Sequence, residues 1–192
     1  MGLAVPTTEN TVFPESKYAR IERERRFLLN DFPPGLTRAS EHVQIWDNYI
    51  TNTRMRLRKI RLLPSGQYIA KLTQKYAPDP GDSSRTVITN TYLSAEEYEV
   101  LSVFEGNEIR KNRYPFEYQG RRYAIDLFIG PLWGLILAET EFATDDEMAA
   151  LAVPDFAALE VTHDPAFTGA KLVDLTTAEI REHLRKNYDG AK

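Results

Sequence analysis

The stretch IERERRFLL, residues 21–29, carries acidic and basic side chains at every second position. If this stretch forms a β-strand, successive side chains point to opposite faces of a sheet. Glu22, Glu24 and Arg26 then share one face, and Ile21 and Phe27 lie on the other. Two carboxylates and a guanidinium in one row raise the question of what this face binds.

Seven further segments have the alternation or the composition of strands, and the two within 108–130 flank a turn at Gln119–Gly120. The segments are 43–50, 52–63, 67–77, 85–93, the two within 108–130, and 133–142. Three capping boxes, each a Ser or Thr followed three residues later by Glu, predict helices after Ser94, Thr144 and Thr176. Strands far outnumber helices, so the sequence predicts an antiparallel α+β protein.

Composition narrows the class of protein and its surroundings. The chain has 192 residues, which suits one domain: we expect a flexible N-terminal arm over 1–17 and a single domain over 18–192. The formal net charge of −4 gives no indication of a nucleic-acid partner. The chain has no Cys and no apolar run long enough to cross a membrane, so we expect no membrane partner and a cytoplasmic location.

Charged residues at alternating positions recur in most of the other predicted strands, and they segregate by strand. Basic residues crowd the middle strands, whereas carboxylates crowd the first and last ones. A sheet with one solvated face is the simpler interpretation of any single strand. The segregation favours a barrel with an acidic and a basic inner wall. Guanidinium groups bind phosphates and carboxylates bind hard divalent cations, so a polyphosphate–metal complex fits between the walls.

Six segments, taken in order, resemble the CYTH domains, also called triphosphate tunnel metalloenzymes. IERERRFLL is similar to the E-x-E-x-K signature of the family, with Arg26 in the place of the usual Lys. The family's R-x-R, L-T-x-K, K-x-R-Y, Asp and closing E-x-E strands are matched, in that order, by RMRLR (54–58), LTQK (72–75), IRKNRY (109–114), AIDLFIG (124–130) and LILAETEF (135–142). The resemblance covers about residues 18–175.

This resemblance implies an eight-stranded antiparallel β-barrel that forms a tunnel, with helices packed outside. Family members hydrolyse inorganic, nucleoside or thiamine triphosphates, or cyclise ATP, with Mg²⁺ or Mn²⁺ as cofactor. Carried over by position, the metal ligands would be Glu22, Glu24, Asp126, Glu139 and Glu141, with Glu22 and Glu24 also catalytic. The substrate phosphates would be held by Arg26, Arg56, Arg58, Lys75, Arg85, Lys111 and Arg113, and by Arg54 and Lys71, which share the parity of this set.

The chain departs from the family pattern after Arg85. Many members continue there with alternating glutamates, whereas Val87 and Thr89 stand at those positions in this chain. The final family segment is matched only loosely, by FTGAKL (167–172), in which Lys171 is a candidate phosphate contact. For the C-terminal helix we consider two roles: packing on the barrel, or a plug that covers one tunnel end.

These observations predict metal-dependent hydrolysis of a triphosphate-containing small molecule, with inorganic tripolyphosphate as the expected substrate. The sequence has many cations of the kind that bind phosphate, and it has no obvious element that would recognise a nucleotide base. A nucleoside or thiamine triphosphatase, or an adenylyl cyclase, is the alternative among enzymes. From another class, a non-catalytic module that binds polyphosphate or nucleotide would need the same basic wall.

Overall fold

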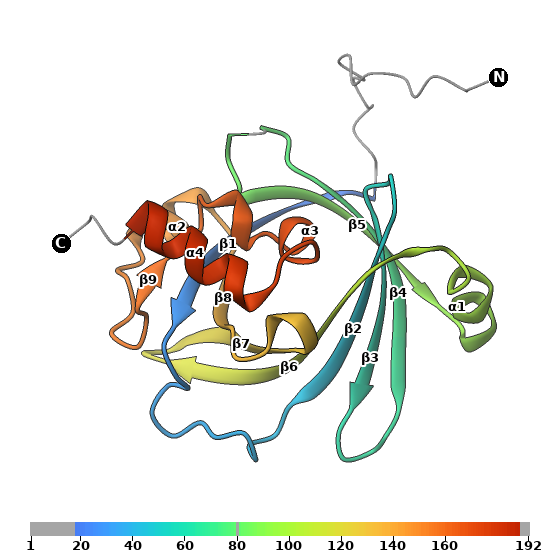
Figure 1. The fold of residues 1–192 in the computed structure, drawn as a ribbon, viewed down its shortest axis with the longest axis horizontal. Helices are drawn as coiled ribbons and strands as arrows, with labels where there is room; N and C mark the ends of the chain where they lie inside the picture. The colour runs from blue at the N-terminus through green and yellow to red at the C-terminus, as the bar shows by residue number, and fades with distance from the viewer. Residues whose placement is uncertain (1–17, 80, 189–192) are drawn as a thin grey trace.

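The computed structural model of the protein describes residues 18–79 and 81–188, and it shows a β-barrel with helices around it (Figure 1). The wall consists of β1 (Arg20–Leu29), β2 (Val43–Ile50), β3 (Met55–Leu62), β4 (Tyr68–Tyr76), β5 (Arg85–Leu93), β6 (Gly106–Tyr118), β7 (Arg121–Ile129) and β8 (Ile136–Phe142). The arm that the sequence predicts over residues 1–17 lies outside the described residues.

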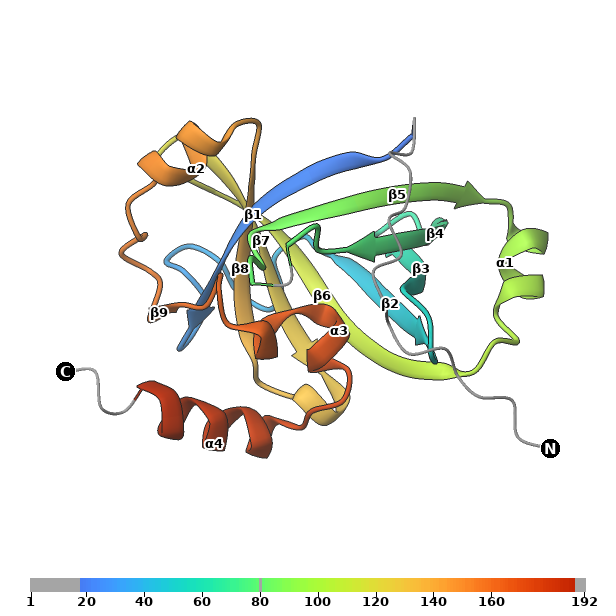
Figure 2. The same ribbon diagram turned by 90° about the horizontal axis from the view of Figure 1, so that it is seen from above.

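The barrel is closed and its strands are antiparallel. They follow the order β5-β4-β3-β2-β6-β7-β8-β1, and β1 returns to pair with β5. In the view from above, β1 and β5 run along one side of the ring and β2 and β6 along the other (Figure 2). The sequence does not predict the short strand β9 (Leu159–Glu160). It pairs with Phe27 and Leu28 of β1, beyond the part of β1 that pairs with β5. The predicted eight-stranded antiparallel barrel is confirmed.

A tight turn sets the register of the β6–β7 hairpin. Gln119 and Gly120 both have positive φ, 50° and 74°, as a two-residue turn with the right twist requires. Pairing then runs back from the turn and places Arg113 directly opposite Asp126 and Lys111 opposite Phe128. The turn that the sequence predicts therefore determines which charges meet inside the barrel.

The three predicted helix starts are confirmed. The helices are α1 (Ala95–Leu101), α2 (Asp145–Ala150), α3 (Gly169–Leu172) and α4 (Thr177–Tyr188), with two 3₁₀ turns, η1 (Gly130–Leu132) and η2 (Pro165–Phe167). Ser94 and Thr144 each accept a hydrogen bond from the backbone N–H three residues on, and Thr176 and Glu179 cap each other. The sequence analysis did not predict α3 or η2, which are too short to show a helical period.

One end of the barrel interior is apolar and filled. Phe128 and Leu137 lie two positions along their strands from residues on the inner face, so they also point inward. They form one buried cluster with Phe167, Leu172 and Ile180 from the end of the chain. We call residues 161–184 the plug, because this segment closes that end of the barrel. The arrangement agrees with the plug interpretation of the C-terminal helix.

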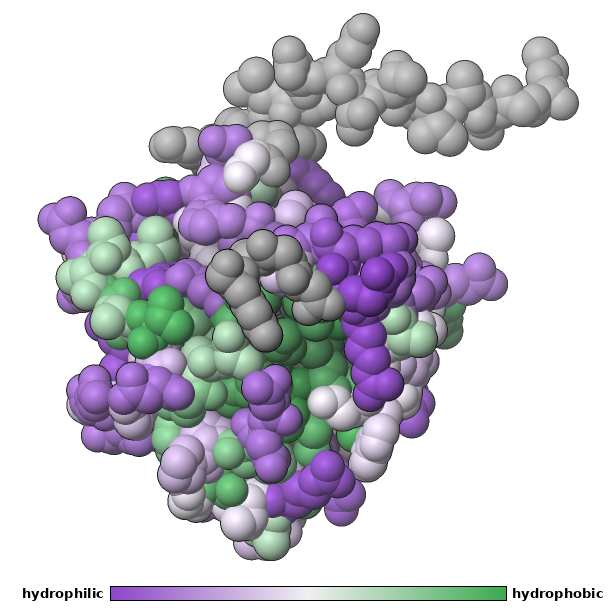
Figure 3. All heavy atoms as spheres, turned by 60° about the vertical axis from the view of Figure 1, so that its left-hand side comes forward, coloured by the Kyte–Doolittle hydropathy of each residue, from purple (hydrophilic) through white to green (hydrophobic). Residues whose placement is uncertain are grey.

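A second apolar cluster covers the outside of the wall. Phe27, Tyr114 and Ile125 from three strands pack there against Leu151 and Phe156. On the face that carries α2 and α4, polar side chains surround a hydrophobic area (Figure 3). Among residues 18–79 and 81–188, no helix is long and apolar enough to cross a membrane.

Candidate active site

The other end of the barrel interior holds a cavity of about 430 Å³. Residues from seven strands, all but β7 of the barrel wall, line it together with residues at the start of α3. The cationic residues in the lining are Arg20, Arg26, Arg54, Arg56, Arg58, Lys71, Lys75, Lys111 and Arg113. The carboxylates in the lining are Glu22, Glu24, Glu139 and Glu141. The cavity thus carries an excess of positive charge and suits a polyanion.

The register of β2, β3 and β4 builds the basic wall. Arg58 lies directly opposite Lys71 on β4 and opposite Asp47 on β2, and residues paired in this way share a face. Burial, and the positive charges of Arg58 and Arg56, lower the pKa of Lys71 to about 8. Burial and the neighbouring positive charges thus both favour the neutral form of Lys71.

Two guanidinium groups in the lining have unsatisfied donors. Arg26 has only 3% of its surface exposed, yet its Nε–H has no hydrogen-bond partner among the described residues, and neither has that of Arg56. A buried donor without an acceptor costs free energy. A phosphate oxygen in the cavity would supply the missing acceptor.

The acidic wall comes from β1 and β8, where Glu24 lies opposite Glu141. Lys75 Nζ lies 2.5 Å from Glu22 Oε2 and 3.6 Å from Glu24 Oε1. Burial alone would raise the pKa of Glu22, but Lys75 outweighs it and the pKa is lowered. For Glu139 burial is likewise outweighed, by the cations Lys111 and Arg113, so its pKa lies well below the usual range.

Glu141 differs from the other three carboxylates. Its side chain makes no hydrogen bond or ion pair with another described residue, and burial, Glu22 and Glu24 raise its pKa. Four converging carboxylates have the donor chemistry that hard divalent cations prefer, and a cation would relieve the repulsion that Glu141 experiences. No group of three His, Cys, Asp or Glu within the described ranges is already arranged to hold a metal. The residues fit a divalent cation chemically, but Glu22 and Glu139 would have to turn from their present partners.

All but two of the site residues proposed from the sequence line this cavity. Their roles as metal ligands or phosphate contacts stay predictions, because lining a cavity does not show what is bound. The two exceptions are Arg85 and Asp126. Lys171 is likewise outside the lining, which α3 reaches instead through Gly169 and Ala170.

Arg85 lies on the outer face of the barrel. Its guanidinium hydrogen-bonds to Asp82 and to Asp145, the latter at 3.1 Å. It pairs across the sheet with Arg23, whereas Thr86 pairs with Glu22 and so faces inward. A phosphate contact from Arg85 therefore has no geometric basis.

The face of β5 was predicted one residue out of phase. Thr86, Ile88 and Asn90 line the cavity, whereas Val87 and Thr89 do not. The segment 85–93 has apolar residues on both faces, so its alternation does not reveal which face is inside. The segment 85–93 has no Asp or Glu on either face, so β5 contributes no carboxylate to the lining.

Asp126 lies behind the lining instead of in it. Its side chain is fully buried and accepts hydrogen bonds from Lys111 Nζ at 2.5 Å and from Arg113 at 2.6 and 2.7 Å. Two cations therefore separate this carboxylate from the cavity. The structure gives Asp126 the position of a brace for Lys111 and Arg113, not that of a metal ligand.

Sequence reasoning missed Asp47 and Tyr49, both on β2. Tyr49 lines the cavity, and a Cβ added to Gly169 would lie 2.0 Å from its hydroxyl oxygen, so only glycine lets α3 approach so closely. Asp47 is buried beneath Arg58. The available signal was the alternation of Ile45, Asp47 and Tyr49, with an acid in an otherwise apolar and aromatic row.

Comparison with known proteins gives two relatives in sequence and a solved structure that shares this barrel. No protein-family model matches the chain. The chain is 38% identical over 96 residues to an inorganic triphosphatase of Acetivibrio thermocellus; the match covers 44% of this chain and 60% of that relative. It is 29% identical over 154 residues to an inorganic triphosphatase of Nitrosomonas europaea, covering 79% of this chain and 95% of the relative. The crystal structure of the inorganic triphosphatase NE1496 superimposes with a TM-score of 0.54 at 26% identity, covering 79% of this chain and 93% of that one.

A closed antiparallel barrel whose interior carries basic and acidic walls is the architecture that the resemblance to the triphosphate tunnel family implies. The solved structure of the inorganic triphosphatase NE1496 has the same fold. The chain therefore has the fold that its resemblance to the CYTH domains implies.

Proposed function

We propose that this protein hydrolyses a linear triphosphate inside the tunnel, with inorganic tripolyphosphate as substrate. The observation that carries the proposal is one enclosed cavity in which a cationic wall faces a wall of carboxylates. The names of the relatives support the same reaction. The excess of cations over carboxylates suits a chain of phosphates better than a single one.

The basic wall binds and orients the phosphate chain. Arg56, Arg58 and Lys71 lie together on β3 and β4, and guanidinium groups can hold phosphate oxygens in a bidentate manner. Phosphoryl transfer needs little covalent chemistry from the protein, so alignment and charge neutralisation account for most of the catalysis. No nucleophilic side chain is required.

The acidic wall is suited to a divalent cation, which we propose to be Mg²⁺ or Mn²⁺. Its ligands would come from Glu22, Glu24, Glu139 and Glu141. When bound, such an ion neutralises phosphate charge and lowers the pKa of a water. Lys75 lies between Glu22 and Glu24 in the structure, and an arriving phosphate offers it an alternative partner, which would leave both carboxylates available.

The proposal is tested by measuring phosphate release from tripolyphosphate, pyrophosphate, ATP and thiamine triphosphate, each with Mg²⁺, with Mn²⁺ and with EDTA. We expect tripolyphosphate with a divalent ion to be fastest, and Glu22→Gln to abolish turnover while circular dichroism shows an unchanged fold. Release of pyrophosphate with cyclic AMP from ATP would favour a cyclase. Tight binding of tripolyphosphate without turnover under any condition would instead show a binding module.

A further inference from the structure

Strand β2 carries a buried carboxylate that contacts the basic wall but does not line the cavity. β2 lies between β3 and β6, and none of the predicted site residues belongs to it. Asp47 on this strand is 1% exposed and is not part of the cavity lining. It therefore cannot bind substrate itself, and its effect on the site must pass through other side chains.

The contacts of Asp47 are with two cations of the wall. Arg58 donates to it twice, from Nε to Oδ1 at 2.5 Å and from Nη2 to Oδ2 at 2.6 Å. The Nε of Arg56 lies 3.6 Å from Oδ1 of the same carboxylate. A bidentate pair fixes the plane of a guanidinium as well as its distance. One carboxylate thus sets the orientation of Arg58 and draws Arg56 toward it.

The electrostatic setting supports an ionised Asp47. Burial would raise its pKa, but Arg58 and Arg56 outweigh burial and hold the pKa far below its usual value. Without this negative charge, Arg56, Arg58 and Lys71 would face one another unshielded. Such a cluster would spread apart or lose a proton, and either change spoils a geometry matched to phosphate.

We propose that Asp47 is a positioning residue, which holds Arg58 and Arg56 in the geometry that binds a phosphate chain. The inference rests on the proposed function, because the positioned groups are those assigned there to substrate. Removing Asp47 makes the tunnel more positive, yet the tunnel should bind a polyanion less well.

The test is Asp47→Asn, which keeps the shape of the side chain and removes the charge. If Asp47 positions the guanidiniums, the KM for tripolyphosphate should rise roughly 10- to 100-fold, the loss expected when charge-assisted hydrogen bonds are misaligned. The alkaline limb of the pH profile should also move to lower pH, since Asp47 is one of the charges that raise the pKa of Lys71. A purely structural role would lower the melting temperature and leave that limb in place.

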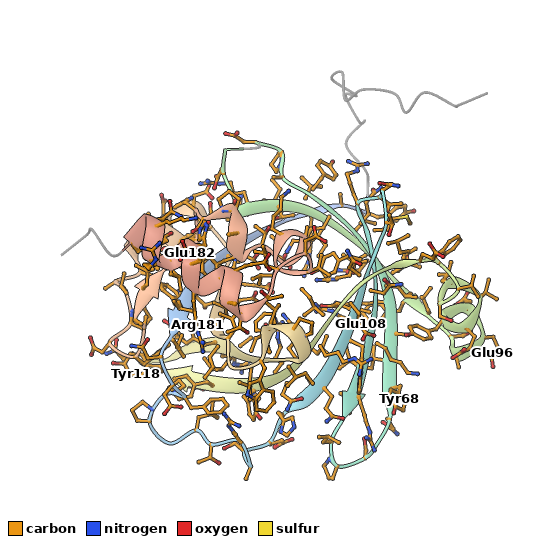
Figure 4. All side chains as sticks on the ribbon, viewed as in Figure 1. Tyr68, Glu96, Glu108, Tyr118, Arg181 and Glu182 are labelled. Carbon is orange, nitrogen blue, oxygen red and sulfur yellow. The ribbon has the colours of Figure 1, made fainter. Side chains whose placement is uncertain are left out.

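Glu108→Gln is the matched control. Glu108, which is labelled in Figure 4, lies on β6 and is exposed. It pairs with Arg110, and neither residue lines the cavity. Like Asp47→Asn, this variant removes the negative charge of an Arg–carboxylate pair. Because the pair lies away from the cavity, the KM and the pH profile of the variant should equal those of the unchanged protein. If Asp47→Asn binds tripolyphosphate as tightly as this control, or more tightly, net charge governs binding and the positioning role is overturned.

A second variant covers the case in which Asp47→Asn does not fold. Arg58→Lys keeps the positive charge and Asp47 but breaks the bidentate pair, and it should reproduce the loss of affinity; wild-type affinity in this variant would also overturn the proposal. Binding of tripolyphosphate to the unchanged protein is measured first, in EDTA and then with Mg²⁺. If the unchanged protein neither binds nor hydrolyses it, the proposed function has failed. If it does both and the variants match it, only the positioning role has failed.

Discussion

Binding of tripolyphosphate should raise the melting temperature of the protein. The cavity lining holds an excess of like charges, and two of its guanidinium groups have a buried Nε–H without an acceptor. The cations of the lining repel one another in the folded state and move apart in the unfolded chain. A polyanion that enters the cavity relieves the repulsion and fills the empty hydrogen-bonding positions, and it finds this site only in the folded state.

The size of the shift follows from linkage. A ligand that binds only the folded state stabilises it by RT ln(1 + [L]/Kd), which is about 2.7 kcal/mol at one hundred times Kd. For a protein of this length, each kcal/mol raises the melting temperature by about 2–4 °C. The expected shift is therefore about 5–10 °C, measured by differential scanning fluorimetry in EDTA so that no turnover occurs.

The order of the ligands makes this prediction specific. Tripolyphosphate should shift melting most, pyrophosphate less and orthophosphate least, because a shorter chain reaches fewer of the cations. Sulfate at matched ionic strength controls for screening of exposed charges. If tripolyphosphate shifts the melting temperature no more than sulfate does, the charged strands do not act as one enclosed site and the reasoning fails.

Three further predictions concern single residues. Affinity for tripolyphosphate should fall as the pH rises through about 8, the pKa of Lys71, because a bound anion favours the protonated amine; calorimetry at pH 8.5 should detect proton uptake that Lys71→Arg removes. Arg85→Ala should leave KM and kcat within about twofold of the unchanged protein, as expected for a surface substitution, and a large rise in KM would return Arg85 to the site. Ile180→Ala should lower the free energy of unfolding by about 2–5 kcal/mol in urea titrations, because its side chain fills the closed barrel end; a negligible change would show that the plug does not pack there.

The sequence could predict the fold and most of the lining because the period of a strand is short and its turns are recognisable. In β1, Glu22, Glu24 and Arg26 fall on one parity, and the structure turns that parity inward. The hairpin at Gln119–Gly120 set the register that brings β6 and β7 together. Both features are local, so one sequence is enough to detect them.

The sequence could not show how deeply a charged side chain is buried, or which face of an apolar strand turns inward. Asp126 has the inward parity that was predicted, but only the packing shows that Lys111 and Arg113 cover it. In β5 apolar residues occupy both faces, and pairing with β1, which is distant in sequence, decides that Thr86 points inward. Both outcomes depend on contacts between strands, which the alternation within one strand does not encode.

The segregation of charge that the sequence suggested holds at the surface of the cavity but not beneath it. Asp47 on β2 lies against the cations of β3, and Asp126 on β7 lies against those of β6. Buried charges are tolerated only when they are paired, and each of these acids pairs with two cations. Carboxylates behind the wall thus allow the barrel to fold with so many cations facing its cavity. The uncompensated charge then lies in the lining itself, where a phosphate chain can reach it.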